Sequence, residues 1–143
     1  MKLLAGIRVL DLTNVLSGPF ATLNLALLGA EVIKVENPVD GDLARKLGCV
    51  PKYNQVLMGT SFLAQNANKK SLTLNLKAPA GHHTSHKPVA ARDVLAGAVR
   101  PDRVARRGPS ESDVLVRHGV QLELVRDPRQ ALQRMRDVPG RVT

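Results

Sequence analysis

The chain of 143 residues has no tryptophan, one cysteine and only three aromatic residues, Phe20, Tyr53 and Phe62. Because large aromatic anchors are so few, any hydrophobic core must consist mainly of Leu, Val and Ala side chains. The single cysteine, Cys49, cannot form a disulfide within the chain, and no second cysteine stands at the spacing of a metal clip. A reducing, cytoplasmic compartment is therefore expected.

Long hydrophobic runs are also absent. No stretch approaches the ~20 consecutive apolar residues of a membrane span. Residues 1–6 lack the apolar run of a signal peptide. The sequence therefore predicts a soluble protein with no membrane partner.

Acidic residues are scarce relative to basic ones, 12 against 21, which gives a net charge of +9. Such an excess is common in proteins that bind nucleic acids. Here the cations are spread along the chain, and the aromatic residues do not alternate with arginines as on a base-stacking platform. No nucleic-acid partner is expected, although a small basic nucleic-acid-binding protein remains an alternative hypothesis.

Basic residues change in kind near residue 78. Residues 1–78 contain seven Lys and two Arg, whereas residues 79–143 contain one Lys and eleven Arg. All three aromatic residues lie in the first segment and all four histidines in the second. The change predicts either a domain boundary or a second segment that has diverged from its original fold.

A strand, a helix and a second strand are predicted within the first 36 residues. Residues 7–12 are almost continuously apolar, as in a parallel strand buried on both faces. Residues 20–28 form a helix that is apolar nearly all round, which favours burial, and Gly29 ends it. Residues 31–36 alternate polar and apolar side chains and predict the second strand. Together they form a βαβ unit of an α/β fold.

Further elements are predicted with less regular patterns. Asp42 is placed to cap a short helix that ends near Leu47. Residues 53–66 indicate helix or coil, broken at Gly59, and residues 71–76 alternate strictly as a third strand. The remaining predictions are a short strand at 93–96, a helix around Val104 and a helix at 128–137.

The segment between the first strand and its helix is the first candidate site. In open α/β sheets, ligands bind outside the carboxyl ends of the strands. Ser17 can cap the helix and Pro19 fits its first turn. Backbone N–H groups near Ser17 and Gly18 can bind an anion or a carbonyl oxygen. The alternative is a capped helix without a ligand, since no G-x-G-x-x-G sequence is present.

Two further groups of residues have alternative readings. Lys69 and Lys70 precede a predicted strand, where they can either bind phosphates or lie in solvent and block edge-to-edge aggregation. A cluster of histidines lacks a nearby Cys or carboxylate, so a solvated loop is favoured and no metal is expected. These histidines are His82, His83 and His86.

Five motifs, in the same order and with the same gaps, are similar to the amino-terminal part of family III CoA-transferases. They are Gly6–Thr13, Ser17–Pro19, Leu28–Glu36, Gly41–Asp42 and Asn68–Lys77. This CaiB/BaiF family includes formyl-CoA:oxalate CoA-transferase and the α-methylacyl-CoA racemases. The resemblance is close over residues 1–78 and weak from there to about residue 108. Nothing in the later part of the divergent, Arg-rich segment 79–143 is recognised.

The resemblance implies a Rossmann-like parallel sheet, a fragment of the family's large domain, with CoA lying along the carboxyl ends of the strands. In the first loop, Leu16 and Ser17 would offer backbone groups to CoA. Asn37 stands where many members have an Arg, which weakens a contact to phosphate. The other matched positions comprise the segment that lines the adenine and phosphate end and two later arginines. They are Leu74, Asn75, Leu76, Lys77, Arg100 and Arg106.

The resemblance also implies the reaction, in which CoA passes between carboxylic acids through an aspartate that attacks the acyl-CoA thioester. In the family that aspartate lies beyond the position of Thr143, so no catalytic residue is assigned, and a truncated or inactive member is expected. Family members form interlocked homodimers, for which this chain is expected to be too short. A fragment similar to an α-methylacyl-CoA racemase remains the alternative within the family.

Overall fold

The computed structural model describes residues 2–75, 92–98 and 120–124. Five strands in these segments form one sheet, and the helices lie between the strands along the chain. The elements are β1 (Arg8–Asp11), α1 (Ser17–Leu27), β2 (Glu31–Glu36), the 3-10 helix η1 (Leu43–Lys46), α2 (Pro51–Gln55), α3 (Thr60–Asn66), β3 (Lys70–Thr73), β4 (Val94–Ala98) and β5 (Val120–Leu124).

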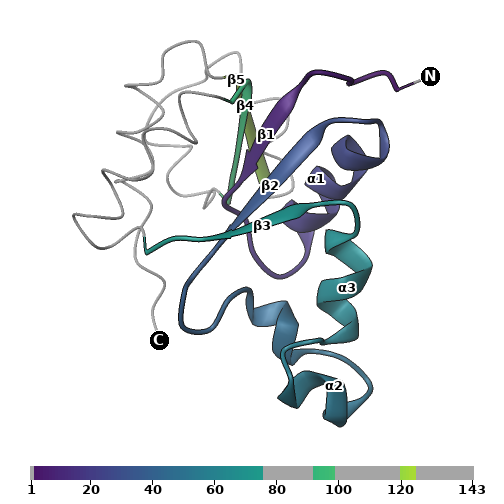
Figure 1. The fold of residues 1–143 in the computed structure, drawn as a ribbon, viewed down its shortest axis with the longest axis vertical. Helices are drawn as coiled ribbons and strands as arrows, with labels where there is room; N and C mark the ends of the chain where they lie inside the picture. The colour runs from purple at the N-terminus through teal and green to yellow at the C-terminus, as the bar shows by residue number, and fades with distance from the viewer. Residues whose placement is uncertain (1, 76–91, 99–119, 125–143) are drawn as a thin grey trace.

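The strands lie in the order β3-β2-β1-β4-β5 (Figure 1). β1 pairs in parallel with β2 and β4, β2 pairs in parallel with β3, and β5 runs antiparallel to β4. The chain thus builds outward from β1 to β3 and then crosses to the other side of β1, as in the first half of a Rossmann fold. The prediction of an α/β fold with a Rossmann-like parallel sheet is confirmed. The sheet also joins strands from both sides of residue 78.

Both faces of β1 are buried, as its apolar sequence predicts. Val9 lies on the face covered by α1, where it packs with Ala26. Leu10 lies on the opposite face and packs with Val35 and Leu95 from the two neighbouring strands. A central strand covered on both sides needs apolar residues at consecutive positions, which explains the sequence of this strand.

β2 alternates polar and apolar residues, yet it too is buried on both faces. Lys34 is 1% exposed and Glu36 is 4% exposed, although both carry charged side chains. Val35, between them, is also buried. Lys34 and Glu36 share a face with Val32, which packs in the cluster of Val9 and Ala26, whereas Val35 packs with Leu10 on the opposite face. The candidate site begins where Lys34 and Glu36 lie, toward the end of this strand.

The ends of α1 agree in part with the sequence. Pro19 stands in the first turn and is buried. The helix ends at Leu27, and Gly29 follows with a φ of +105°, a conformation that glycine adopts without strain. The prediction that Ser17 caps the helix is wrong, because its side chain makes no capping hydrogen bond and Leu16 occupies the cap position.

The prediction that α1 is buried nearly all round is also wrong. Phe20 is 57% exposed and Leu27 is 68% exposed, while Leu23 and Ala26 are buried. The apolar residues therefore cover one buried face and one open face. Within the described segments, no helix is long and apolar enough to span a membrane.

Between β2 and β3 the chain forms three short helices. The Asp42 carboxylate accepts a hydrogen bond from the N–H of Ala44 and so caps η1, as predicted. The predicted helix or coil at 53–66 comprises α2 and α3, with the interruption at residues 56–59. α3 packs against both η1 and α1, whereas α2 lies away from the sheet (Figure 1).

The remaining strands differ from their predictions at the ends. β3 covers 70–73 where 71–76 was predicted, and β4 covers 94–98 where 93–96 was predicted. β5 was not predicted, although Val120, Leu122 and Leu124 alternate with polar residues. The predicted helices near Val104 and at 128–137 lie outside the described residues, as does the histidine cluster.

Candidate functional site

The carboxyl ends of β1, β2 and β3 meet at one edge of the sheet, since the three strands are parallel neighbours. The segments that leave this edge are residues 12–16 after β1, residues 37–42 after β2 and residues 74–75 after β3. β1 is also the strand at which the strand order reverses. Open α/β sheets bind ligands at such a switch point, so this edge is the candidate site.

The first of these segments, residues 12–16, is buried at Thr13 and exposed at its end. Thr13 is 2% exposed, while Leu16 is 61% exposed and Ser17 is also exposed. Val15 has a φ of +70°, a left-handed conformation that β-branched residues rarely adopt. Outlying backbone of this kind persists where surrounding contacts hold it, and it is common at ligand sites.

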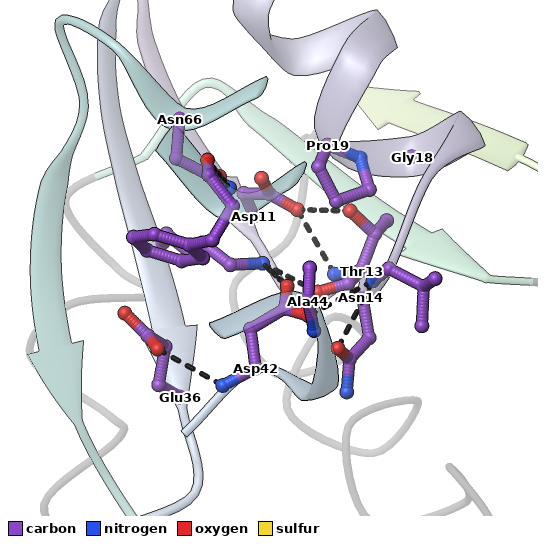
Figure 2. A network of polar contacts seen from close by, with 12 residues as sticks. Asp11, Thr13, Asn14, Gly18, Pro19, Glu36, Asp42, Ala44 and Asn66 are labelled. Atoms are coloured by element: carbon purple, nitrogen blue, oxygen red, sulfur yellow. Dashed lines mark hydrogen bonds and ion pairs between the residues drawn. The ribbon is translucent and has the colours of Figure 1, made fainter. Parts of the chain in front are cut away.

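Asp42 connects the segment after β2 to the segment after β1. Its Oδ1 accepts hydrogen bonds from Val15 N at 3.0 Å and from Ala44 N at 2.9 Å. Its Oδ2 forms an ion pair with Lys34 Nζ at 2.7 Å, and both side chains are almost inaccessible to solvent. Lys34 Nζ also donates to the Thr13 carbonyl at 2.8 Å. Figure 2 shows Asp42 close to Thr13 and Asn14.

A second buried ion pair, between Asp11 and Lys69, lies deeper under α1. Asp11 Oδ2 is 3.2 Å from Lys69 Nζ and 2.6 Å from Thr22 Oγ1. Its Oδ1 accepts hydrogen bonds from the N–H and hydroxyl of Thr13 (Figure 2). Burial by itself raises the pKa of Asp11, but Lys34, Lys69 and the two threonine hydroxyls outweigh it and lower that pKa.

Lys69 is held by several acceptors. Burial lowers the pKa of its ammonium group, and Asp11 opposes that shift. The solvated reading of Lys69 is wrong, because its side chain is 1% exposed and forms an ion pair with Asp11. Lys70 is 71% exposed and pairs with Glu31, which fits the solvated reading.

Glu36 forms the third ion pair of the site. Its carboxylate receives two hydrogen bonds from Arg45, at 2.6 and 2.8 Å, and one from Ser71 Oγ at 2.7 Å. The N–H of Asp42 donates to it as well, and the Arg45 guanidinium stacks on the Phe62 ring at 3.7 Å. Burial opposes ionisation, but these hydrogen bonds prevail and lower the pKa of Glu36 to about 2.

Acidification is expected to destabilise the protein through Glu36. A folded pKa of about 2 against 4.5 for the free side chain corresponds to about 3 kcal/mol of stability. Because the folded pKa is the lower one, this stability is complete above pH 4.5 and decreases as the pH falls toward 2. Urea unfolding between about pH 6 and pH 3 should show the decrease. Glu36→Gln should have a shallower pH dependence than the unchanged protein, and equal slopes would contradict the assignment.

The structure describes five of the nine residues that the resemblance implies as CoA contacts. Leu16 and Ser17 are exposed at the candidate edge. Asn37 is exposed beside it, and its Oδ1 accepts a hydrogen bond from Val39 N at 2.9 Å within the turn. Leu74 is half-buried against the apolar face of the sheet, and Asn75 is exposed after it. Leu76, Lys77, Arg100 and Arg106 lie outside the described residues.

The buried ion pairs behind the candidate edge were not assigned from the sequence. A charged residue inside an otherwise apolar strand, such as Asp11 or Lys34, is the signal that was available. Among the described residues, no group of three or more His, Cys, Asp or Glu side chains could hold a metal ion. The buried charged groups behind the edge form ion pairs with one another. The exposed part of the site consists of the backbone and side chains of its loops.

Comparison with known proteins agrees with this fold. The sequence model of CoA-transferase family III matches residues 4–119. The chain is 46% identical over 114 residues to the succinyl-CoA:glutarate CoA-transferase of Mus musculus, covering 80% of this chain and 26% of that protein. It is 42% identical over 108 residues to a formyl-CoA:oxalate CoA-transferase of Rhodopseudomonas palustris, covering 75% of this chain and 24% of that protein.

A solved structure is similar as well. The D175A mutant of Rv3272 from Mycobacterium tuberculosis superposes with a TM-score of 0.61 at 37% identity, covering 79% of this chain and 29% of that chain. The present chain spans about a quarter of the length of the curated relatives it matches. The match of the family model over most of the sequence, together with these identities, shows that the chain belongs to CoA-transferase family III.

Proposed function

We propose that the carboxyl edge of the sheet binds the CoA part of an acyl-CoA thioester, for transfer of CoA between carboxylic acids. The observation that carries the proposal is the segment after β1, which presents exposed Leu16 and Ser17 at the switch point of the strand order. Membership in the family supports CoA as the ligand of this edge. The two relatives named above act on dicarboxylic acids, which favours a dicarboxylate as the acceptor.

The described residues suit a binding role along this edge. Leu16 is the large exposed side chain of the first loop and offers an apolar surface to part of the ligand. Ser17 begins α1, where backbone N–H groups and the helix dipole favour a phosphate or a carbonyl oxygen. Asn37 and Asn75 lie on the neighbouring loops and add polar groups. The positive charges that would pair with the CoA phosphates are assigned to Lys77, Arg100 and Arg106.

The buried carboxylates of the site are not proposed as nucleophiles. Asp11, Glu36 and Asp42 are each almost fully buried and paired with a cation. A carboxylate that attacks a thioester must reach the carbonyl carbon and be free to form a new bond. We therefore propose a structural role for these three residues, and we assign the covalent step to no residue of this chain.

Leu16→Glu tests the proposal. A carboxylate in the first loop would repel the phosphates of CoA and remove an apolar contact, so the affinity for CoA should fall about tenfold or more. Isothermal titration of the full chain with CoA measures the effect. Leu27→Glu is the matched control, because Leu27 is a similarly exposed leucine at the other end of α1 and should leave the affinity within about twofold.

Two results would contradict the proposed function. The first is the absence of binding heat when the unchanged chain is titrated with millimolar CoA. The second is an equal loss of affinity in Leu16→Glu and Leu27→Glu, because the effect would then follow from net charge and not from the position of the first loop.

A further inference from the structure

The backbone of the first loop has an unfavourable conformation at Val15. Val15 has a φ of +70°, which is unfavourable for a residue branched at Cβ. Its N–H donates to Asn14 Oδ1 and to Asp42 Oδ1, each at 3.0 Å. The N–H group is thus aimed inward at two side-chain oxygens, and the next residue, Leu16, is exposed. The contact to Asp42, from outside the loop, therefore helps to hold the backbone directly before Leu16.

Lys34 provides a further contact from outside the loop. Its Nζ is 2.7 Å from Asp42 Oδ2 and 2.8 Å from the Thr13 carbonyl oxygen. The two charged side chains are only 2% and 1% exposed. A buried ion pair is a poor source of stability, because desolvation cancels much of the attraction, and its attested use is to specify one arrangement over others. Here the arrangement that it specifies is that of the first loop.

The same contacts join the first loop to the segment after β2. Asn14 Oδ1 accepts a hydrogen bond from Leu43 N at 3.0 Å, and Asp42 Oδ1 accepts one from Ala44 N at 2.9 Å. Each side chain thus bonds to both segments at once. The two segments that flank the proposed CoA site are therefore joined by the side chains of Asn14 and Asp42.

We propose that Lys34, Asp42 and Asn14 form a loop clamp, a set of positioning residues that hold residues 13–17 in the conformation that presents Leu16 and Ser17 to CoA. The inference rests on the proposed function, and it adds which residues set the shape of the site. The clamp acts through preorganisation: without it, the loop would have to be ordered by CoA at the expense of affinity.

Lys69 provides a matched control for Lys34. Its side chain is 1% exposed and is paired with a buried aspartate, Asp11. Its other acceptors are the Pro19 carbonyl, Thr22 Oγ1 and Asn66 Oδ1, all outside residues 13–17. Loss of either lysine leaves a buried carboxylate without its cation, but only loss of Lys34 removes a direct contact to the first loop.

The test compares Lys34→Met with Lys69→Met in the full chain. Both variants should lower the unfolding midpoint by a similar amount. Lys34→Met should also weaken CoA binding about tenfold or more, whereas Lys69→Met should leave the affinity within about threefold. Equal losses of affinity in the two variants, or an unchanged affinity in Lys34→Met, would overturn the loop clamp.

A milder pair of variants keeps the test decisive if Lys34→Met does not fold. Asn14→Ala removes the two hydrogen bonds to Val15 N and Leu43 N, and it should weaken CoA binding by about three- to tenfold. Asn24→Ala removes one side-chain hydrogen bond on the exposed part of α1 and should bind CoA normally. The clamp is rejected if the two variants bind CoA equally well.

Amide exchange separates failure of the clamp from failure of the proposed function. Asn14→Ala should increase exchange at the Val15 and Leu43 amides, while Asn24→Ala should not. If the unchanged chain binds CoA and these amides keep their protection in Asn14→Ala, the clamp alone is wrong. If the unchanged chain does not bind CoA, the proposed function fails, whatever the exchange rates are.

Discussion

Asp11→Ala is expected to lower the free energy of unfolding by about 3–5 kcal/mol, because it leaves a buried ammonium group without its anion. Asp11 is 0% exposed, and its carboxylate accepts hydrogen bonds from Thr13, Thr22 and Lys69. The alanine variant also leaves the two threonine hydroxyls without this acceptor, which adds to the cost. For a domain of ordinary stability, about 5–15 kcal/mol, most of the margin would be lost. Urea unfolding followed by circular dichroism measures it.

Asp40→Ala is the control for this prediction. Asp40 also forms an ion pair, with Lys46 at 2.6 Å, but its side chain is 62% exposed. Exposed pairs contribute at most about 1 kcal/mol, so this variant should be nearly as stable as the unchanged protein. If Asp11→Ala loses no more stability than Asp40→Ala, the carboxylate is not what accommodates Lys69 inside the protein, and the description of the buried network must be revised.

The parallel sheet could be predicted because its signals are local. The apolar run at 7–12, the glycine after the helix and the alternation at 31–36 each occur within a few residues, and each was found in the structure. β5 was missed although Val120–Leu124 alternates as strictly as residues 71–76, which were predicted as a strand. β5 is antiparallel to β4 and lies at the edge of the sheet. It is therefore not part of a βαβ unit, which is the pattern that indicated β1 and β2.

The buried network could not be predicted, because its partners are distant in the sequence. Lys69 and Asp11 are 58 residues apart, and no local pattern connects them. Lys69 and Lys70 are adjacent in the sequence, yet the side chain of Lys69, directly before β3, is buried, and that of Lys70, the first residue of β3, is exposed. The sequence around Asp42 correctly predicted that it caps a helix. Its second oxygen forms an ion pair with Lys34, and the capping pattern gives no sign of that pair.

The candidate site combines both kinds of information. Leu16 and Ser17 were proposed as contacts from a resemblance, and their exposure at the switch point follows from the order of the strands. In our proposal, the path of the loop from β1 to Leu16 and Ser17 depends on the buried charges of Lys34 and Asp42. A residue proposed to contact CoA, such as Leu16, is exposed on a loop, whereas a residue proposed to shape the site, such as Lys34, is charged and buried in a strand.

Gly18→Ala is the second substitution with a large expected effect, a loss of about 3 kcal/mol or more. A Cβ at residue 18 would overlap the Cβ, Cγ2 and Oγ1 atoms of Thr13. Thr13 cannot move aside, because it is 2% exposed and its hydroxyl and N–H are both bonded to Asp11. The glycine between Ser17 and Pro19 is therefore required by the close approach of the loop to the start of α1. Chemical denaturation of the full chain measures the loss.

Gly97→Ala is the matched control, since a Cβ at residue 97 would have no described atom within 4 Å. It should be neutral within about 0.5 kcal/mol or slightly stabilising, because alanine suits a strand better than glycine. Thr13→Gly should recover part of the stability of Gly18→Ala, since it removes the atoms that the new Cβ meets, and a double-mutant cycle would show the coupling. Equal tolerance of alanine at residues 18 and 97 would mean that the loop relaxes, and its path would then not be fixed by contact with α1.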